Sequence, residues 1–568
     1  MHAMRFHAFP SRAKSLSGGG SARPDRRMRR GVLAAVIAAV IVAGALSTYF
    51  LLYLPSQRRG KVKTVVYAYP DKITGIDPSI EDDTGIVVIG SVYETLLRYD
   101  PIRNVTVPVL AESWESSENG TVWVFRLRRG VVFHDGTPLN ATAVKLSIER
   151  ARDVYRETGR GCGYIWDAVE EVEVVDDYTV RVKLSYPQRL DLMAAASYAA
   201  YVFSPSALAR AGAKGPLDPK LEEWFNSGND AGSGPYYVEY YSPESEVRLR
   251  KFEKWWGWSL VNNPDAPDVV VIKIRPDPLD QYNGLLAGEI DIASSVPRAN
   301  VRDLAARGFK VINLTTFHNY ILLLNVRRYP TSVREFRLAL LHAIPWDEIV
   351  NVALKGFGKR GSGILPHGFP GHVEGLRYSY NLTLAREYLK RSGVGPGATV
   401  EFVYQSDYEE NEAFAQLLKS RLAELNITVV LKPMPWTAVK DAGKEVWTNP
   451  DAAPHLIISD WWPTMPSPYD YLYSLLHSES TEWNWAGYNN TEFDELVDKA
   501  YKLEGADYAE ALRLYAEAQR IVHEEGVAVN LWDEVRPFVV GGRVEVPENA
   551  LNPLYMFVIR FEYVRVKE

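Results

Sequence analysis

Two adjacent tryptophans, Trp461 and Trp462, are the clearest candidates for ligand contact in this sequence. They follow the apolar run 456–459, which is typical of a buried strand, and they precede a proline-rich loop. Both indoles are therefore expected at the carboxyl end of a strand, where α/β sheets bind ligands. An indole face covers a sugar ring or an apolar side chain. Asp460 and Thr464, on either side of the pair, offer polar partners.

Four further side chains complete the predicted ligand-binding set. A neutral ligand needs hydroxyl, amide and aromatic partners, and residues of these types occur near predicted strand ends. They are Asn325, Tyr469, Trp436 and Trp532.

A His-Asp pair could suggest a general base, but we interpret it as a structural turn. His134 and Asp135 stand before Gly136 and Thr137, and Asp-Gly is typical of a tight turn. A hydrolase would also need a nucleophile, and no Gly-x-Ser-x-Gly motif or suitable Cys–His pair accompanies this one. The sequence thus predicts no catalytic residue.

A second histidine cluster contains residue types that bind metals. His367, His372 and Glu374 could coordinate nickel or zinc, because imidazole and carboxylate suit these ions. Their surroundings are a loop rich in Pro and Gly, with no helix or strand to fix ligand geometry. We therefore expect solvated loop residues, and predict neither a metal nor a cofactor.

The composition is that of a largely soluble protein with several lobes. At 568 residues and 64.0 kDa the chain is long enough for large cores. Its one cysteine, Cys162, excludes intramolecular disulfides and cysteine-rich metal centres. The net charge is −7, although residues 1–30 hold eight basic residues and one acidic residue. The acidic remainder lacks the clustered Lys and Arg that a nucleic-acid partner requires.

Residues 31–54 form an uncharged, mostly apolar run that is long enough to cross a bilayer as a helix. The arginines before it predict that residues 1–30 are a disordered cytoplasmic tail and that the body is extracytoplasmic. The alternative is a cleaved signal peptide, because Ala43-Gly44-Ala45 resembles a cleavage site. Seven Asn-x-Thr sequons also fit an exported, glycosylated surface.

Hydrophobic periodicity predicts a strand-rich region followed by an α/β region. Alternation indicates strands at 62–69 and 121–127, and a hairpin in which strands 172–175 and 178–184 flank Asp176-Asp177. We therefore predict that residues 99–205, which contain this hairpin, form a strand-rich lobe.

The second half of the chain carries a βαβ pattern. A helix at 413–425 lies between strands 400–404 and 427–431, which indicates a parallel sheet. A later helix is expected to begin at a Thr491-x-x-Asp494 cap.

Several separated motifs occur in the order typical of one protein family. They are Ile76-Asp77-Pro78, Val92-Tyr93-Glu94-Thr95-Leu96, the segment 110–151, Gly232-Ser233-Gly234-Pro235-Tyr236-Tyr237, Leu286-Ala287-Gly288-Glu289-Ile290-Asp291, Leu324-Asn325-Val326, Phe336-Arg337-Leu338-Ala339-Leu340, Gly356-Phe357-Gly358 and the segment 460–478. Over residues 62–568 the chain resembles the solute-binding proteins of ABC importers, family 5, which includes oligopeptide-, dipeptide- and nickel-binding proteins.

The resemblance implies a three-lobed periplasmic-binding-protein fold, of class α/β. Its first binding domain would comprise residues 62–98, 206–275 and 531–568, and its second domain residues 276–530. The inserted lobe would comprise 99–205. Two crossing strands would form the hinge, and ligand would favour the closed form that the permease recognises.

We therefore expect a receptor that captures an oligosaccharide or oligopeptide and delivers it to ABC permease subunits. Peptide binders of the family carry an Asp three residues after the tryptophan that corresponds to Trp461, and this Asp pairs with the peptide ammonium. Here the position is Thr464, so the expectation leans towards an oligosaccharide. Asp460 could supply the charge instead. The alternatives are a membrane-anchored glycoside hydrolase or peptidase, and a sensor, for which residues 1–30 are too short.

Overall fold

The computed structural model describes residues 62–194 and 198–567. The predicted tail 1–30 and the predicted transmembrane segment 31–54 lie outside these residues. Within them, no helix combines the length and the hydropathy that crossing a bilayer demands.

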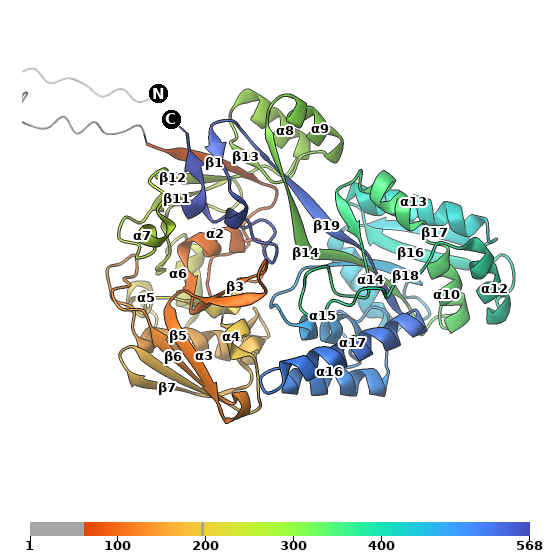
Figure 1. Ribbon diagram of the computed structural model, residues 1–568, viewed down its shortest axis with the longest axis horizontal. Helices are drawn as coiled ribbons and strands as arrows, with labels where there is room; N and C mark the ends of the chain where they lie inside the picture. The colour runs from red at the N-terminus through yellow and green to blue at the C-terminus, as the bar shows by residue number, and fades with distance from the viewer. Residues whose placement is uncertain (1–61, 195–197, 568) are drawn as a thin grey trace, which may run out of the picture. The chain divides into compact units, whose positions relative to one another are not determined.

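A sheet of 11 strands forms the framework of the described residues (Figure 1). Its order is β10-β11-β12-β1-β13-β19-β14-β18-β16-β17, and β15 pairs with β19. The strands are β1 (Thr64–Tyr69), β10 (Tyr236–Ser242), β11 (Glu246–Lys251), β12 (Val269–Ile274), β13 (Ile292–Ala293), β14 (Lys310–Leu324), β15 (Gly358–Arg360), β16 (Thr399–Gln405), β17 (Thr428–Met434), β18 (Leu456–Trp461) and β19 (Ala528–Val540).

The long antiparallel strands β14 and β19 connect the two halves of this sheet, side by side in Figure 1. One end of the pair continues through β13 into the first half, and the other continues through β18 into the second. Their register shifts between Thr315 and Asn319. Because an irregular ladder bends more readily than a regular one, the expected hinge of the two crossing strands would lie at this point.

The first half of the sheet includes residues that we expected in the second domain. The predicted boundary at residue 276 is corrected, because β13 pairs in parallel with β1. Helices α8 (Pro278–Ala287) and α9 (Val301–Ala306) also bury Leu285 and Leu304 in one cluster with Ala68. The segment 276–309 therefore packs with the first domain, and the chain leaves that domain along β14.

The inserted region contains the predicted strand-rich lobe. Its four-stranded sheet has the order β5-β6-β8-β7, with β5 (Ala111–Ser117), β6 (Val122–Leu127), β7 (Val169–Asp176) and β8 (Thr179–Leu184). The predicted hairpin is confirmed, since Asp176 pairs with Thr179. Helix α3 (Ala141–Thr158) packs on this sheet and begins where the Asn140 side chain accepts a hydrogen bond from the Ala143 amide.

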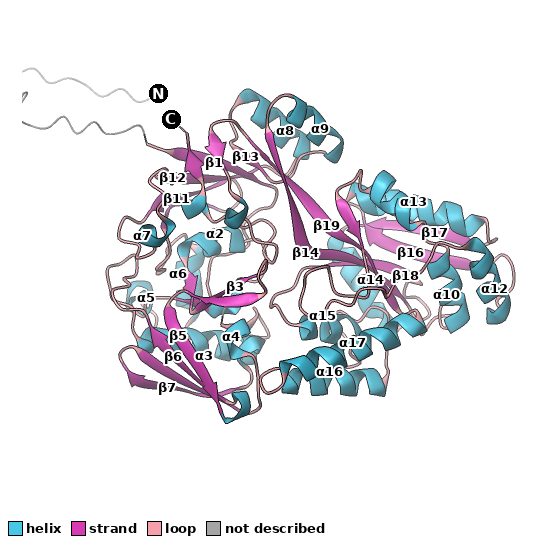
Figure 2. Cartoon of the chain, viewed as in Figure 1, coloured by secondary structure: helices cyan, strands magenta, loops and turns pink. Residues whose placement is uncertain are grey.

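The second half confirms the predicted βαβ unit. β16 and β17 are parallel, and α13 (Glu409–Ala423) connects them. The α10 (Arg334–His342), α12 (Leu382–Ser392) and α13 helices lie around these strands in Figure 2. Helix α16 (Thr491–Leu503) starts one residue earlier than expected, because Asn490 rather than Thr491 caps it by accepting from the Phe493 amide. α17 (Tyr508–Glu525) packs against α16.

Candidate ligand-binding site

A narrow aromatic hollow with a volume of about 30 Å³, which is about the space of one water molecule, opens beside the carboxyl end of β1. Its lining comes from β1, the loop before α2 (Ile86–Val92), the residue after β18 and a segment near the C-terminus. The lining residues are Tyr69, Asp71, Asp83, Thr84, Ile86, Tyr198, Trp462, Leu554, Tyr555, Met556 and Phe557. This volume is far below that of a typical small-molecule site, although the lining, a few polar groups among apolar walls, is typical of such sites.

The aromatic walls are held by edge-to-face contacts. The Tyr69 and Phe557 rings lie 5.3 Å apart at 84°, and those of Tyr198 and Tyr555 lie 5.2 Å apart at 82°. This geometry is the preferred one for aromatic pairs, because the positive edge of one ring faces the negative face of the other. The walls are thus braced independently of any ligand.

Two carboxylates, Asp71 and Asp83, face this hollow without a basic partner. Both keep access to solvent, yet the surrounding protein removes enough water to raise the pKa of each. The charge of Asp83 raises the pKa of Asp71 further, whereas the charge of Arg536 lowers it. The charge of Lys440 lowers the pKa of Asp83. Among the described ion pairs within 4 Å, none includes either carboxylate. A cationic ligand group would neutralise the charge of both carboxylates.

The hinge holds a buried charge network next to the hollow. The His318 imidazole lies between two carboxylates, with Nε2 3.1 Å from Asp460 Oδ2 and Nδ1 2.8 Å from Glu534 Oε2. Burial alone would lower the pKa of His318, but the hydrogen bonds to these carboxylates outweigh it and raise the pKa to about 9. The imidazole is therefore doubly protonated at neutral pH and donates to both acids.

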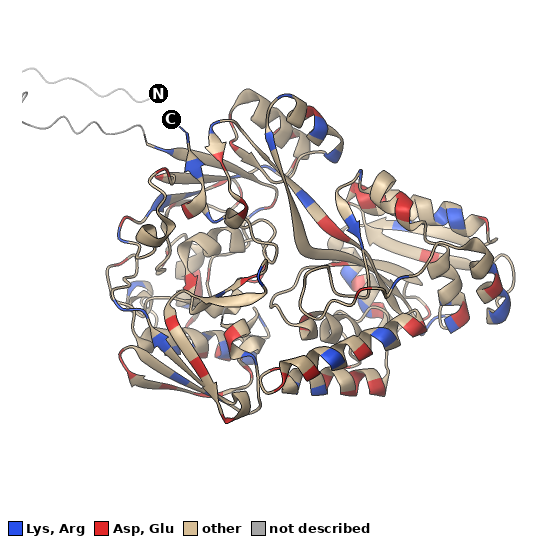
Figure 3. Ribbon diagram, in the orientation of Figure 1, with Lys and Arg blue, Asp and Glu red and all other residues tan. Residues whose placement is uncertain are grey.

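Arginines complete this network and connect it to the hollow. Arg536 Nη2 lies 2.9 Å from both Glu534 carboxylate oxygens, and its guanidinium stacks 4.1 Å from the ring centroid of Phe557. Arg298 bridges Glu410 at 2.8 Å and Glu534 at 3.5 Å. Figure 3 shows basic and acidic segments next to each other along β19. The network's charges balance, so the unmatched charge of the site resides on the hollow's own acids.

Trp462 and Asp460 are the two predicted site residues that the structure places at the hollow or its base. Trp462 lines the hollow, and its ring lies 5.7 Å from that of His318. Asp460, at the end of β18, faces His318. The imidazolium already matches the charge of Asp460, so this carboxylate is not free to replace the family's missing acid.

Trp461 and Thr464 lie instead at a contact between the inserted lobe and the second domain. The Trp461 indole donates to Asp470 at 2.9 Å, and the Thr464 hydroxyl donates to the same carboxylate at 2.6 Å. Tyr164 of the inserted lobe reaches the Thr464 hydroxyl at 2.5 Å. Burial raises the pKa of Asp470 to about 6, although these donors oppose the shift. The expected ligand partner Thr464 thus satisfies a buried acid.

A second contact between the same lobes involves the turn between α16 and α17. Gln188 donates to the Tyr501 hydroxyl at 2.6 Å, and the Arg189 guanidinium lies 4.7 Å from the Tyr508 ring. Gly505 lies so close to the Gln188 backbone that an added Cβ would be 2.3 Å from its nitrogen. The described conformation therefore has the inserted lobe closed on the second domain.

The remaining four predicted residues are used elsewhere in the fold. Asn325 is buried, and its amide group bonds to Pro454 and Arg327 of the backbone. The residues that pack in aromatic clusters are Trp532 on Tyr320, Trp436 on Trp483, and Tyr469 between Tyr473 and Tyr501. We do not include them in the site.

The His134 turn is as predicted, but the second histidine cluster differs. Gly136 has φ of 85° and closes the turn through its amide to Phe133, and His134 bonds to Asp230 at 2.6 Å. The expectation of solvated residues is wrong for His367, which is 6% exposed because its ring bonds to the buried Asp533.

The residues that sequence reasoning missed are the acids and the C-terminal aromatics. Asp71 lies just after the carboxyl end of β1, a position like that of Trp461 at the end of β18. The rule that ligands bind at the carboxyl ends of strands could therefore have identified Asp71. Asp83 and Phe557 carry no local signal, because only the folded chain brings their segments to β1.

A surface depression at the edge of the sheet is a weaker candidate. It is lined by Tyr240, Ser245, Glu246, Arg248, Lys273, Ile274 and Arg275. Both of its arginines are already paired, with Arg248 2.5 Å from Glu246 and Arg275 2.8 Å from Asp280. We therefore place the ligand site at the aromatic hollow.

Comparison with known proteins finds relatives that cover most of this chain. Residues 105–483 match the model of bacterial extracellular solute-binding proteins, family 5. The glutathione-binding protein GsiB of Pectobacterium atrosepticum is 27% identical over 472 residues, or 80% of this chain and 86% of that protein. The dipeptide-binding protein of Escherichia coli is 25% identical over 500 residues, covering 83% and 89%.

Solved structures show the same fold. The substrate-binding protein CtaP of Listeria monocytogenes has a TM-score of 0.78 at 20% identity, covering 89% of this chain and 100% of that one. The Helicobacter pylori protein DppA, in complex with the peptide STSA, has a TM-score of 0.73 at 24% identity, covering 89% and 98%.

Proposed function

Because the chain belongs to family 5 of the bacterial extracellular solute-binding proteins, we propose that it captures a short peptide by domain closure and delivers it to an ABC import permease. The observation that carries the ligand class is the pair of acids without basic partners, Asp71 and Asp83, in an aromatic hollow. A free peptide ammonium placed between them would neutralise the site. A neutral sugar would leave two partly desolvated charges unmatched, which supports a peptide over the oligosaccharide that we expected from Thr464.

The ligand that fits best is a dipeptide or tripeptide with no excess negative charge. At about 30 Å³ the hollow of the described conformation holds no peptide, so we propose that it widens when the domains open, and Trp462 and Phe557 then offer faces to apolar side chains. Glutathione, which carries one net negative charge at neutral pH, suits the acidic hollow less well. The relatives that are named for dipeptides and for glutathione support the peptide class as a whole.

Closure would bring ligand groups from both domains together. The proposed hinge in β14 and β19 lies beside His318. Trp462 lines the hollow from the second domain, and Phe557 lines it from the C-terminal part of the first domain. We propose that the body acts outside the cytoplasm, with residues 31–54 as its membrane tether. No turnover is proposed, since the relatives are binding proteins.

Calorimetry on paired ligands tests the ammonium assignment. We expect a dipeptide with a free N-terminus to bind and its N-acetylated form to bind at least tenfold more weakly. Asp71→Asn and Asp83→Asn should each cost about 1.5–3 kcal/mol, or roughly 10- to 100-fold in affinity, which is typical of a hydrogen bond to a charged group. Asp82→Asn is the matched control, because it removes an equal charge from a neighbour that does not line the hollow.

Two outcomes would overturn the proposal. Tight binding of di- to pentasaccharides that is insensitive to Asp71→Asn would restore the sugar reading. Recovery of hydrolysed rather than intact peptide after incubation would restore the alternative of a peptidase or glycoside hydrolase.

A further inference from the structure

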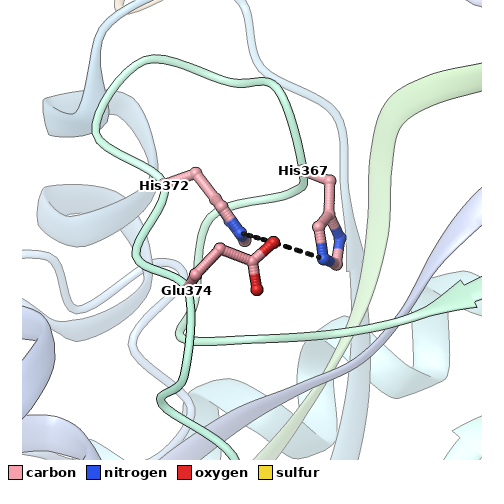
Figure 4. A group of neighbouring side chains, drawn as sticks. All are labelled: His367, His372 and Glu374. Carbon is pink, nitrogen blue, oxygen red and sulfur yellow. Dashed lines mark ion pairs between the residues drawn. The ribbon is translucent and has the colours of Figure 1, made fainter.

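A cluster of two histidines and one glutamate lies in the loop between β15 and α12, outside the ligand hollow. His367, His372 and Glu374 each offer one ligand atom, and these atoms lie within 4.8 Å of one another. Figure 4 shows both imidazoles turned towards the Glu374 carboxylate. The two Nε2 atoms are each 3.4 Å from Glu374 Oε1. No residue of this cluster lines the hollow.

The hydrogen bonds of the two rings assign their free nitrogens. His367 Nδ1 lies 2.5 Å from Asp533 Oδ2, and His372 Nδ1 lies 2.8 Å from the Leu365 carbonyl. A carboxylate and a carbonyl only accept, so each Nδ1 must be the protonated nitrogen. In the neutral rings both Nε2 lone pairs therefore point at Glu374. A metal-bound histidine typically has its other nitrogen fixed by an acid or a carbonyl in this way.

The outer groups are themselves held in place. Asp533 is fully buried on β19, and its carboxylate also accepts from the His367 amide at 2.9 Å and from Asn530 at 2.7 Å. The His367 ring is consequently fixed to the crossing strand, although its residue belongs to a loop. The rigid framework that the sequence lacked is supplied by tertiary contact.

One nitrogen of the cluster makes no hydrogen bond. His372 Nε2 is buried without a hydrogen bond, and the His372 side chain is nine-tenths buried. A buried polar atom left unsatisfied is costly, and a ligand would satisfy it. Arg377 occupies the other side of the cluster, with Nη2 3.3 Å from His367 Nε2 and 2.9 Å from Glu374 Oε2. A cationic group thus already lies against two of the three proposed ligands.

We propose that His367, His372 and Glu374 bind a divalent transition metal, with zinc as the best fit. In a tetrahedral zinc site with bonds of about 2.0–2.1 Å, neighbouring ligand atoms are about 3.4 Å apart, and two of the three separations here already equal this value. Two imidazoles and one carboxylate suit zinc, nickel and cobalt rather than magnesium or calcium. Water or another small ligand would take the fourth position, and Arg377 would swing into solvent.

The function of this site is structural and does not depend on the proposed peptide ligand. His367 is bonded to β19 through Asp533, whereas His372 and Glu374 lie further along the loop. A metal would therefore fasten the loop to the crossing strand close to the hinge.

Metal content of the full chain tests the proposal. After chelation, reloading with zinc and gel filtration, we expect one zinc per chain by mass spectrometry, with higher thermal stability than the metal-free form. His372→Gln and Glu374→Gln should each weaken zinc binding by at least about 10- to 100-fold, as loss of even an outer-shell partner does. His342→Gln, another half-buried histidine, is the control and should keep the metal.

Removing the competing cation gives a test in the opposite direction. Arg377→Ala should bind zinc more tightly than the wild type, and cobalt should give the visible absorption bands of a tetrahedral site. The proposal is overturned if the wild type retains no zinc, if His372→Gln and Glu374→Gln retain as much as His342→Gln does, or if Arg377→Ala weakens binding.

Discussion

Replacing His318 by glutamine should remove a pH-dependent part of the stability. The imidazolium donates to Asp460 and Glu534 inside the hinge, where its ring is fully buried. Glutamine keeps polar contacts but carries no charge, so the two acids lose their shared cation. Removing one partner of a buried ion pair typically costs about 3–5 kcal/mol.

The pH dependence follows from the raised pKa of His318. Moving a pKa from 6.5 to about 9 corresponds to about 3 kcal/mol, at roughly 1.36 kcal/mol per pKa unit. The pKa of Glu534 is lowered chiefly by Arg536 and then by His318, so its shift is not added to that of His318. Because the folded-state pKa is the higher one, this stabilisation is complete below about pH 6.5 and is lost as the pH rises through about 9.

Urea unfolding, followed by tryptophan fluorescence between pH 6 and pH 10, measures this effect. The free energy of unfolding of the wild type should exceed that of His318→Gln by about 3–5 kcal/mol at pH 6, and the difference should shrink by about 3 kcal/mol by pH 10. Groups that titrate in both proteins cancel in this difference. The control His342→Gln should follow the wild type throughout. A difference between the wild type and His318→Gln that stays constant with pH would refute the reasoning, because His318 would then not titrate in this range.

Three other experiments address ligand contact against core packing, lobe closure, and membrane anchoring. Trp462→Ala should weaken peptide binding by about 1–3 kcal/mol in calorimetry and change the melting temperature little. Trp532 is fully buried, so Trp532→Ala should lower the free energy of unfolding in urea by about 3–5 kcal/mol. If Trp462→Ala destabilised the fold and Trp532→Ala only weakened binding, the two roles would be exchanged. Gly505→Ala should push the inserted lobe from the second domain, enlarge the particle in small-angle scattering and weaken ligand binding, whereas Gly395→Ala, which has open space around it, should do neither. An intact mass that retains residues 31–54, together with resistance to salt extraction from membranes, would support the anchor, and a mature N-terminus beyond residue 45 would exclude it.

Local periodicity was enough to predict much of the secondary structure. The 172–184 hairpin and the βαβ unit of β16, α13 and β17 are confirmed, because their partners are close in sequence and their apolar residues repeat with the period of the element. The order of separated motifs was enough to identify the family. Trp462, which the strand-end rule selected, lines the candidate hollow.

What the sequence alone could not determine is how distant polar groups are paired. Glu534 reaches His318 across 216 positions only because β14 and β19 pair in one particular register. Thr464 looked available to a ligand, yet the fold uses its hydroxyl for Asp470, whereas Asp71 remains without a basic partner in the hollow. Residue type and spacing fix what a side chain is able to bind. Whether it is left free to bind a ligand depends on long-range contacts, which only the tertiary structure decides.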